Sequence, residues 1–520
     1  MIILSHYIIL LFKGKKMEIT IEKLKELTKD VVLLEHAIAT LSWDQETYMP
    51  PLAIGERGEQ LALLQGLLHE KITSSEIGKL LDDLGADEDN PAGQLEYKAP
   101  IDRAYIKETF RQYKIQTRLS TKLVKDLALE TSLSQAAWIE ARKKSDFTLF
   151  QPHLEKVLNL TKQKAEAIGY KDTPYDALLD EFEPWSSTQE VSNIFDSIQP
   201  WLTDFLGKIY NAKQVDDSFL LKDFDISKQE AFGRKVLEDM GYTYDRGRLD
   251  VSVHPFTTTL GGNDVRLTTR YQKDFFKTGL FGIIHECGHG LYELGFNENL
   301  KGNLLASGTS LGIHESQSRT WENVIGRSYS FWKYYYPILQ KYFPENLNNI
   351  NIDEFYRGIN KVEPSLIRVE ADEVTYNLHI ILRFKLEQEL ISGSLKVKDL
   401  PEAWNKKTEE FLGIRPKNDA NGVLQDIHWP MGAFGYFPTY ALGNLYSAQF
   451  SSVMEKEIDV SGSLENGNLI NILNWLREKI HSHGASKTAE ELALGITGEK
   501  LNPEYFKNYL ENKYKQIYTI

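Results

Sequence analysis

The pentapeptide His285-Glu286-Cys287-Gly288-His289 constrains this chain more than any other stretch of its sequence. Residues at positions i and i+4 share one face of an α-helix, so a helix here brings both imidazoles within reach of one ion. Glu286 would lie beside the open position of that ion, where its carboxylate could accept a proton from a metal-activated water. The pattern therefore predicts a zinc site of the hydrolase type.

The residues on both sides of the pentapeptide are strongly apolar. They are Phe275, Phe276, Leu280, Phe281, Ile283 and Ile284 before it, and Leu291, Tyr292, Leu294 and Phe296 after it. Apolar residues around most of the circumference predict a buried helix. Two buried imidazoles and a carboxylate need partners for their polar atoms, and a metal ion would supply one. The competing interpretation is a hydrogen-bonded His pair on a surface helix.

A zinc site of this kind needs a third protein ligand, and helix geometry limits where that ligand can lie. Glu293 is eight residues from His285, about 12 Å along the axis, which is too far for one ion. Tyr292 and Gly295 stand where the three-histidine pattern H-E-x-x-H-x-x-G-x-x-H requires Gly and His, so that arrangement is excluded. The ligand must come from another segment.

Glu315 is the leading candidate for the third ligand. It is the first acidic residue after the Gly/Asn-rich break over 295–312, and it lies 26 residues beyond His289. That separation allows the chain to turn and return antiparallel to the zinc helix. Glu298 and Glu322 are the alternatives, and spacing alone favours Glu315 only modestly.

The pentapeptide and the segment His314-Glu315-Ser316-Gln317 together resemble the signatures of the carboxypeptidase Taq family of metallocarboxypeptidases. Other segments resemble that family too: Ser42-Trp43-Asp44, Met49-Pro50, Gly55-x-Arg57, His254-Pro255-Phe256, Asp264-x-Arg266-x-Thr268, Ile367-Arg368-x-x-Ala371-Asp372 and Gly422-x-x-Gln425-Asp426-x-His428-Trp429. The resemblance runs in order from about residue 20 to the end. Such a series is far more specific than the zinc motif alone.

The resemblance implies a mainly helical, gluzincin-like fold with a deep groove that holds the metal, and a homodimer. It implies the release of amino acids one at a time from peptide carboxyl termini, with broad specificity. It assigns His285, His289 and Glu315 as metal ligands and Glu286 as the general base. We expect one Zn²⁺ per chain, although two imidazoles and one carboxylate also accept Co²⁺ or Mn²⁺.

Peptide hydrolysis also needs a neutral donor for the oxyanion. His428 and Tyr436 are the candidates because they flank the turn-rich stretch 430–435, which could fold both toward the metal. In the competing interpretation His428, next to Trp429, is a packed core residue.

An exopeptidase must hold a free carboxylate, and a guanidinium is the best match in shape and charge. Arg368 is the leading candidate. Its segment is predicted to open a long helix, with helical periodicity over 369–393. In the competing interpretation Arg368 pairs with Asp372 at i+4 on that helix. Arg266 is the alternative anchor, and Gln425 is a further candidate for substrate binding.

One region lacks the periodicity of a helix. Residues 249–254 and 265–270 alternate between apolar and polar, and the stretch 261–264, Gly-Gly-Asn-Asp, is a strong turn signal. This predicts a β-hairpin directly before the zinc helix. One strand could pair with extended substrate, with His254 and Arg266 near the bound peptide. The competing interpretation is a small sheet that only braces the helix.

No Pro/Gly/Ser linker, internal repeat or low-complexity tract divides the chain, so residues 17–520 are predicted to form one helical body. Helical periods dominate over 19–42, 94–145 and 151–169, and Trp43 is expected to pack in a core. Residues 1–16 are too short for a membrane span and lack the features of a signal peptide. We expect them to be a disordered extension or the product of a mis-called start.

Composition limits the partners. Sixty Lys and Arg against seventy-four Asp and Glu give a net charge of −14, which argues against nucleic acid as a ligand. No membrane partner is expected. The single cysteine, Cys287, cannot form an internal disulfide, which suits a cytoplasmic protein, and it points away from the His face as a packing residue.

Two other functions remain open. An oligopeptidase or endopeptidase on a related helical gluzincin fold would use the same metal chemistry. A peptide-binding scaffold without activity is disfavoured, because a pure binder has no need of Glu286 as a base.

Overall fold

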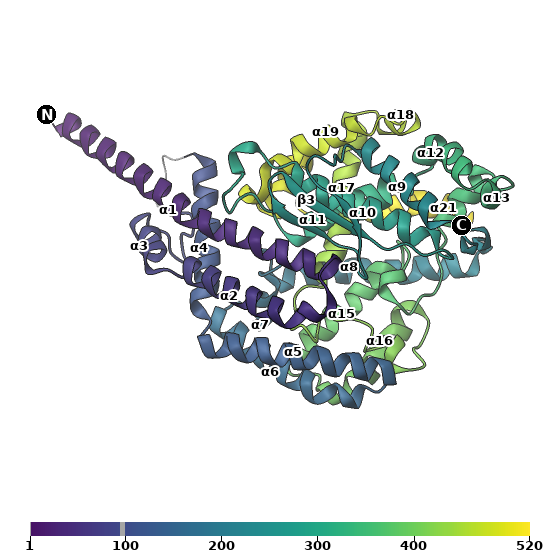
Figure 1. Ribbon diagram of the computed structural model, residues 1–520, viewed down its shortest axis with the longest axis horizontal. Coiled ribbons are helices and arrows are strands. Elements are labelled where there is room, and N and C mark those ends of the chain that lie inside the picture. Colours follow the sequence, from purple (N-terminus) through teal and green to yellow (C-terminus); the bar gives the residue numbers. More distant parts are fainter. Residues whose placement is uncertain (1, 94–98) are drawn as a thin grey trace.

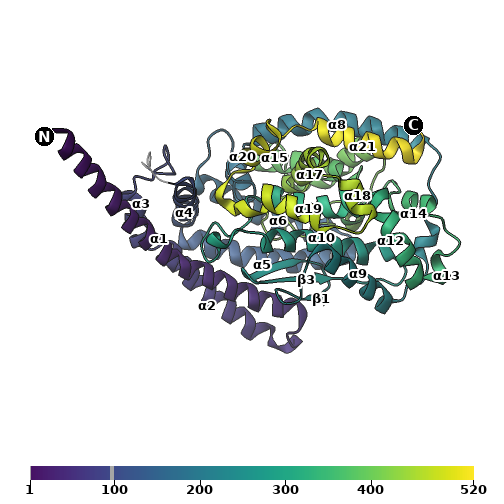
Figure 2. The same cartoon turned by 90° about the horizontal axis from the view of Figure 1, so that it is seen from above.

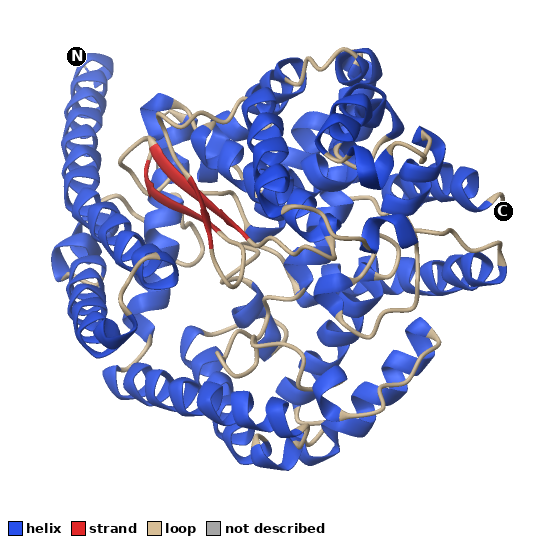
Figure 3. Ribbon diagram, turned by 45° about the vertical axis from the view of Figure 1, so that its right-hand side comes forward, coloured by secondary structure: helices blue, strands red, loops and turns tan. Residues whose placement is uncertain are grey.

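The computed structural model describes residues 2–93 and 99–520, with side chains from Met17 onward. Helices dominate it, and one small sheet lies among them (Figure 3). The long helix α1 (Ile2–Thr47) extends from the body at its amino-terminal end (Figure 1). The backbone of residues 2–16 continues this helix, whereas their side chains lie outside the described residues, so the packing of this extension stays a prediction.

The first helices form a small layer with its own core. After α1 come α2 (Ile54–Ile72), α3 (Ser75–Asp83) and α4 (Pro100–Arg118). Ser74 caps α3 by accepting a hydrogen bond from the Ile77 amide, and the apolar stripe of α3 then faces α1 and α4. Leu304 and Leu305, from a distant loop, complete this core.

The remaining helices surround one large core. They are α5 (Thr121–Lys144), α6 (Gln151–Ile168), α7 (Pro174–Leu179), α8 (Thr188–Asn211), α9 (Ile226–Met240), α10 (Phe276–Leu294), α11 (Leu311–Arg319), α12 (Tyr329–Tyr342), α13 (Pro344–Leu347), α14 (Ile352–Ile359), α15 (Tyr376–Ser392), α16 (Leu400–Leu412), α17 (Pro438–Glu457), α18 (Val460–Glu465), α19 (Ile470–Lys479), α20 (Ala489–Thr497) and α21 (Glu504–Tyr518). Helices α10 and α17 lie inside this body (Figure 2). Residues 17–520 thus contain two cores, and their treatment as one helical body stays a prediction.

The sheet has three strands in the order β1-β3-β2: β1 (Leu249–Val251), β2 (Thr257–Gly261) and β3 (Asp264–Thr269). The hairpin consists of β2 and β3, which are antiparallel. The predicted pairing of 249–254 with 265–270 as a hairpin is therefore wrong, since β1 runs parallel to β3 on its other side. The turn at 262–263 is so short that the strand directly before it becomes the antiparallel partner.

The sheet lies against the zinc helix. Val265 and Leu267 of β3 are fully buried, and a Cβ added to Gly290 of α10 would meet the Leu267 side chain at 2.8 Å. The backbone of α10 therefore approaches the strand closely, and the sheet fixes one side of this helix.

Two predicted helices have different limits in the structure. The segment predicted over 94–145 is α4 and α5, separated at Leu119 and Ser120, and its first residues, 94–98, lie outside the described residues. The helix expected from 369 starts only at Tyr376, because the Asp372 carboxylate accepts hydrogen bonds from the Val374 and Thr375 amides and turns the chain there. Among the described residues, no helix has the length and hydropathy that a membrane crossing requires.

Candidate metal centre

Helix α10 holds both histidines of the pentapeptide on one face. The rings of His285 and His289 lie 4.8 Å apart, edge to face. Both are largely buried, as predicted for this helix. Cys287 points into the core and is completely buried, so its role as a packing residue is confirmed.

Helix α11 brings the third side chain to this pair. The Glu315 Oε2 atom lies 3.7 Å from His285 Nε2 and 3.4 Å from His289 Nε2. Two atoms that bind one tetrahedral zinc ion at about 2.0–2.1 Å lie roughly 3.3 Å apart. The three groups therefore fit a metal ion, and among the described residues they are the set whose ligand atoms converge, within 4.8 Å of one another.

Two glycines allow α11 to come this close. A Cβ added to Gly288 would lie 2.6 Å from the Ser318 Cα atom, and one added to Gly443 of α17 would lie 2.5 Å from Glu315 Cγ. Helix α11 is therefore held between α10 and α17 at backbone distance. This packing sets the position of the Glu315 carboxylate.

Each imidazole is oriented by a partner at its other nitrogen. His285 Nδ1 lies 2.9 Å from Glu322 Oε2, in a π-helical turn over Thr320–Ile325. A carboxylate at Nδ1 keeps the proton there and leaves the Nε2 lone pair for a metal. Glu322, one of the alternative ligands, thus orients a ligand, and Glu298 is exposed beside Lys301.

His289 has a longer chain of partners. Its Nδ1 lies 2.6 Å from His314 Nδ1, and His314 Nε2 lies 2.8 Å from Glu293 Oε1. The Thr259 hydroxyl of β2 donates to the other oxygen of Glu293 at 2.9 Å. Glu293, too far along the helix to bind the ion, therefore holds the residue that orients His289.

The electrostatics keep His289 and Glu315 in the states that bind a cation, whereas for His285 burial lowers the pKa but the Glu315 and Glu322 carboxylates outweigh it and raise the pKa. Burial lowers the pKa of His289 to about 3, so its imidazole is neutral. Burial opposes ionisation of Glu315, but the Arg319 guanidinium and the two imidazoles outweigh it and hold its pKa well below the usual range. Arg319 Nε donates to Glu315 Oε1 at 2.7 Å. The carboxylate therefore stays charged.

The Glu286 carboxylate lies beside the metal group, which consists of His285, His289 and Glu315. The Thr257 hydroxyl donates to the Glu286 Oε2 atom at 2.7 Å and so fixes its direction. Burial raises its pKa above the usual value, with the nearby imidazole of His285 opposing this. A carboxylate with a raised pKa is suited to accepting and returning a proton near neutral pH.

Glu183, which was not predicted as a site residue, holds the first turn of α11 by hydrogen bonds. The fully buried Glu183 accepts hydrogen bonds from the Ser310 hydroxyl at 2.8 Å and the Gly312 amide at 2.9 Å. Burial raises its pKa to about 7. Glu183 precedes Ser310 by 127 residues, so no local pattern could have identified it.

The predicted oxyanion donors lie together in an aromatic cluster. The rings of His428 and Tyr436 are 5.2 Å apart, and His428 Nε2 lies 3.2 Å from the hydroxyl of Tyr440, which was not predicted. Burial lowers the pKa of His428 to about 3, so the ring is neutral. Burial and the Glu315 carboxylate both raise the pKa of Tyr436, so its phenol is protonated within electrostatic reach of the metal group.

Arg368 belongs to a buried cluster of charges. Its Nε donates to Asp426 Oδ1 at 2.9 Å, and Arg383 Nε donates to the other oxygen at 2.7 Å. The alternative pair with Asp372 is wrong, because that carboxylate accepts hydrogen bonds from the Val374 and Thr375 amides just before α15 and Arg368 lies in a separate 3₁₀ turn. The Gln425 side chain accepts a hydrogen bond from the Arg368 amide and so holds the backbone of this turn.

Tyr376 connects this cluster to the metal group. Arg368 Nη1 donates to its hydroxyl at 3.1 Å, and the Arg319 guanidinium lies 4.4 Å from its ring centre. Arg319 in turn holds Glu315. Arg368 is thus three contacts from Glu315.

The two substrate-binding candidates of the sheet region, Arg266 and His254, lie away from the metal group. Arg266 pairs with Asp264 at 2.7 Å and lies 4.2 Å above the ring of Trp43, which is buried as expected. His254 is exposed. Among the described residues, neither Arg266 nor His254 contacts the metal group.

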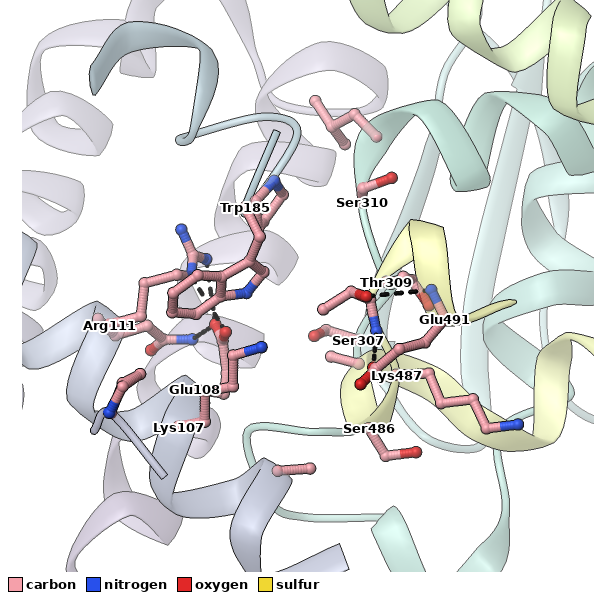
Figure 4. Close-up of a pocket in the computed structure, with 18 of the residues that line it drawn as sticks. Lys107, Glu108, Arg111, Trp185, Ser307, Thr309, Ser310, Ser486, Lys487 and Glu491 are labelled. Carbon is pink, nitrogen blue, oxygen red and sulfur yellow. Dashed lines mark hydrogen bonds and ion pairs between the residues drawn. The ribbon is translucent and has the colours of Figure 1, made fainter. Parts of the chain in front are cut away.

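A cavity of about 980 Å³ lies next to the partners of His289, and Figure 4 shows many of the residues that line it. Its walls come from α4, the loop after α7, the segment before α11 and the segment before α20. His314 and Glu293 line it as well, so it starts at the residues that orient His289.

Comparisons with known proteins agree with this geometry. The family described as Carboxypeptidase Taq (M32) metallopeptidase matches residues 23–514. The thermostable carboxypeptidase 1 of Thermus thermophilus is 40% identical, over 96% of this chain and 99% of its own. Carboxypeptidase 1 of Bacillus subtilis is 39% identical, over 95% of this chain and 98% of its own.

Solved structures share the fold. The M32 carboxypeptidase of Deinococcus radiodurans has a TM-score of 0.92 at 36% identity and covers 96% of this chain and 100% of its own. A Pyrococcus furiosus carboxypeptidase has a TM-score of 0.91 at 39% identity and covers 95% and 99%. The converging His-His-Glu group, the helical fold and these matches agree: the chain belongs to the carboxypeptidase Taq (M32) family and is a metallocarboxypeptidase.

Proposed function

We propose that the protein releases single amino acids from the carboxyl termini of peptides, with broad specificity, using one Zn²⁺ held by His285, His289 and Glu315. The observation that carries this proposal is the convergence of these three ligand atoms beside the buried Glu286. When bound, the ion supplies the Lewis acidity that polarises a peptide carbonyl and acidifies a water molecule.

Glu286 is the general base in this proposal. Its carboxylate accepts the proton of the attacking water and passes it to the departing amine. The Thr257 hydroxyl holds one carboxylate oxygen, so the other is free to face the water. The raised pKa supports both proton transfers.

Tyr436 and His428 stabilise the developing oxyanion as neutral donors. The phenol of Tyr436 is protonated, and His428 is held by Tyr440. Neutral donors positioned in advance at a buried site contribute strongly to acyl transfer.

Arg368 binds the terminal carboxylate of the substrate. In support of this assignment, it lies 5.0 Å from the Tyr440 ring and so beside the oxyanion donors. Gln425 positions it through its amide. Arg266 and His254 are second candidates for contacts with the peptide, on the side of the sheet.

The terminal carboxylate distinguishes an exopeptidase from an endopeptidase. We expect a blocked dipeptide with a free carboxylate to be cleaved at least tenfold faster than its carboxyl-terminal amide, because a desolvated guanidinium recognises the charge. Equal cleavage of the two would favour the oligopeptidase alternative. Metal analysis of the purified protein identifies the ion, with Co²⁺ and Mn²⁺ as the competitors of Zn²⁺.

The proposal includes a cytoplasmic homodimer. The single cysteine suits a reducing compartment. Light scattering on the purified protein measures the assembly.

A further inference from the structure

We propose that the cavity next to the partners of His289 is a subsite for the peptide upstream of the cleaved bond, and that Lys107 makes it select an acidic side chain. This inference rests on the proposed exopeptidase function. It adds a specificity-determining residue on α4, outside the metal centre.

The cavity wall on α4 carries a row of cations. Arg103, Lys107 and Arg111 are spaced four residues apart, so they share one face of the helix, and all three line the cavity. Arg111 is neutralised by Glu108, with two contacts of 3.1 Å. Arg103 and Lys107 remain.

The carboxylates of the cavity already have partners. Glu108 is bound to Arg111 and Gln112, Glu181 to Lys164, Glu293 to His314 and Thr259, and Glu491 to the Thr488 amide. Each of these carboxylates therefore has a hydrogen-bond partner, whereas Arg103 and Lys107 on α4 have no hydrogen-bonded carboxylate among the described residues.

Lys107 is the cation that most needs an anionic partner. Its Nζ atom lies 4.1 Å from the ring centre of Trp185, and among the described residues it has no hydrogen-bond acceptor. Burial lowers its pKa, and the carboxylates of Glu491, Glu108 and Asp180 partly oppose this without forming an ion pair with it. A half-buried ammonium with free N–H groups is stabilised by a carboxylate that enters the cavity.

Trp185 forms the surface over which such a side chain would lie. It is 43% exposed and adopts a φ of 70°, which is unusual for a residue other than glycine. Its amide donates to Asp180 Oδ1 at 2.7 Å, and Arg111 Nη1 donates to the Asp180 carbonyl oxygen at 3.1 Å. The exposed ring is thus held in place from α4.

The opposite wall is lined mainly by hydroxyl groups, with Lys487 and Glu491 beside them (Figure 4). The hydroxyl groups belong to Ser307, Thr309, Ser310, Ser486 and Thr488. Figure 4 shows Lys107 and Trp185 on one side of the cavity and Ser307, Thr309 and Ser486 on the other. A basic and aromatic wall facing a hydroxyl-lined wall suits a polar peptide better than an apolar ligand.

The direction of the peptide follows from the reaction. Thr257 of β2 contacts the general base Glu286, and Thr259 contacts Glu293, which lines the cavity. Thr257 and Thr259 are two strand residues apart, about 6.6 Å, so the cavity begins at Glu293, one side-chain contact beyond β2. An exopeptidase of this polarity holds one residue beyond the cleaved bond, so we assign the space beyond Glu293 to the upstream part of the peptide.

The test uses one peptide series and charge variants of Lys107. Peptides of equal length and identical carboxyl-terminal dipeptide carry Glu, Gln or Lys at each upstream position in turn, and kcat/KM is measured for release of the last residue. In the wild type we expect one position to favour Glu over Gln by about three- to tenfold. Lys107→Met should bring that ratio to about one, and Lys107→Glu should reverse it toward Lys.

Lys122→Glu is the matched control. Lys122 is 84% exposed on α5 and does not line the cavity, so the same charge change should leave the Glu to Gln ratio at its wild-type value. Thermal melting of each variant separates a specificity change from loss of folding, and Lys107→Met keeps the test valid where the charge reversal does not fold.

Three outcomes overturn the inference. If no position responds to charge while single residues are still released, the subsite is wrong and the exopeptidase function stands. If Lys107→Met instead removes the preference for a free terminal carboxylate over its amide, Lys107 binds the terminus and not an upstream side chain. Equal cleavage of acid and amide by the wild type would remove the exopeptidase function and the subsite with it.

Discussion

The metal group and the arginine cluster, which consists of Arg368, Arg383 and Asp426, are both buried sets of charges. They differ in how tightly their charged atoms pair with one another. In the metal group, the two Nε2 atoms and Glu315 Oε2 face one another at 3.4 and 3.7 Å without bonding closely. In the arginine cluster, Asp426 holds one guanidinium on each carboxylate oxygen, at 2.9 and 2.7 Å. The first set is arranged for an additional cation, whereas in the second one carboxylate is shared by two guanidinium groups, which leaves one net positive charge.

The two sets should therefore respond differently to substitution. A buried charge pair contributes little net stability but is costly to break, because the remaining partner stays uncompensated. We therefore expect substitutions in the metal group to change turnover and metal affinity, and removal of the shared Asp426 carboxylate to change folding first.

The largest expected effect is on turnover. Glu286→Gln keeps the shape of the side chain and removes the base, so kcat should fall about a hundredfold to ten-thousandfold. Metal content, measured on the purified variant, should stay at the wild-type level because Glu286 is not a ligand. Retained turnover would mean that another group accepts the proton.

The next effect is on stability. Asp426→Asn leaves Arg383 and Arg368 without a counter-charge in the core, so the free energy of unfolding should fall by about 3–5 kcal/mol. Denaturant unfolding measures this change. Asp196→Asn is the control, since its partner Lys385 is on the surface and such pairs contribute about 0–1 kcal/mol. A similarly small loss for Asp426 would remove the contrast between the two regions.

The smallest effect is on metal affinity. Glu322→Gln weakens the hydrogen bond that orients His285, and the dissociation constant of the metal should rise about ten- to a hundredfold. Competition with a chelator measures it. Glu298→Gln serves as the control, because Glu298 is exposed and bound to Lys301. Unchanged affinity in Glu322→Gln would show that packing alone orients the imidazole.

Sequence patterns predicted the parts of the site that depend on local geometry. The spacing of His285 and His289 sets one helical face, and the structure places both on α10 as expected. The family resemblance, together with spacing, pointed to Glu315. The turn at 262–263 was also recognised, but alternation alone could not decide which strand pairs with β3.

The remaining parts depend on contacts between distant segments. Glu183 reaches Ser310 across 127 residues, and Arg368 meets Asp426 across 58. Asp372 delays the start of α15 to Tyr376 by accepting hydrogen bonds from nearby amides, which periodicity does not reveal. Partner choice among buried charges is a property of the packed structure, and a single sequence leaves several partners equally plausible.

The close approach at Gly288 limits how far this site can be redesigned. The motif H-E-x-x-H leaves two positions free, yet one of them faces the α11 backbone, where a Cβ would lie 2.6 Å from Ser318 Cα. Alanine is more favourable than glycine in a helix by about 1 kcal/mol. Glycine at position 288 therefore lowers the helix propensity of α10 but allows the backbone of α11 to approach it. Transfer of the pentapeptide to another scaffold would therefore have to transfer the contact surface of the neighbouring helix with it.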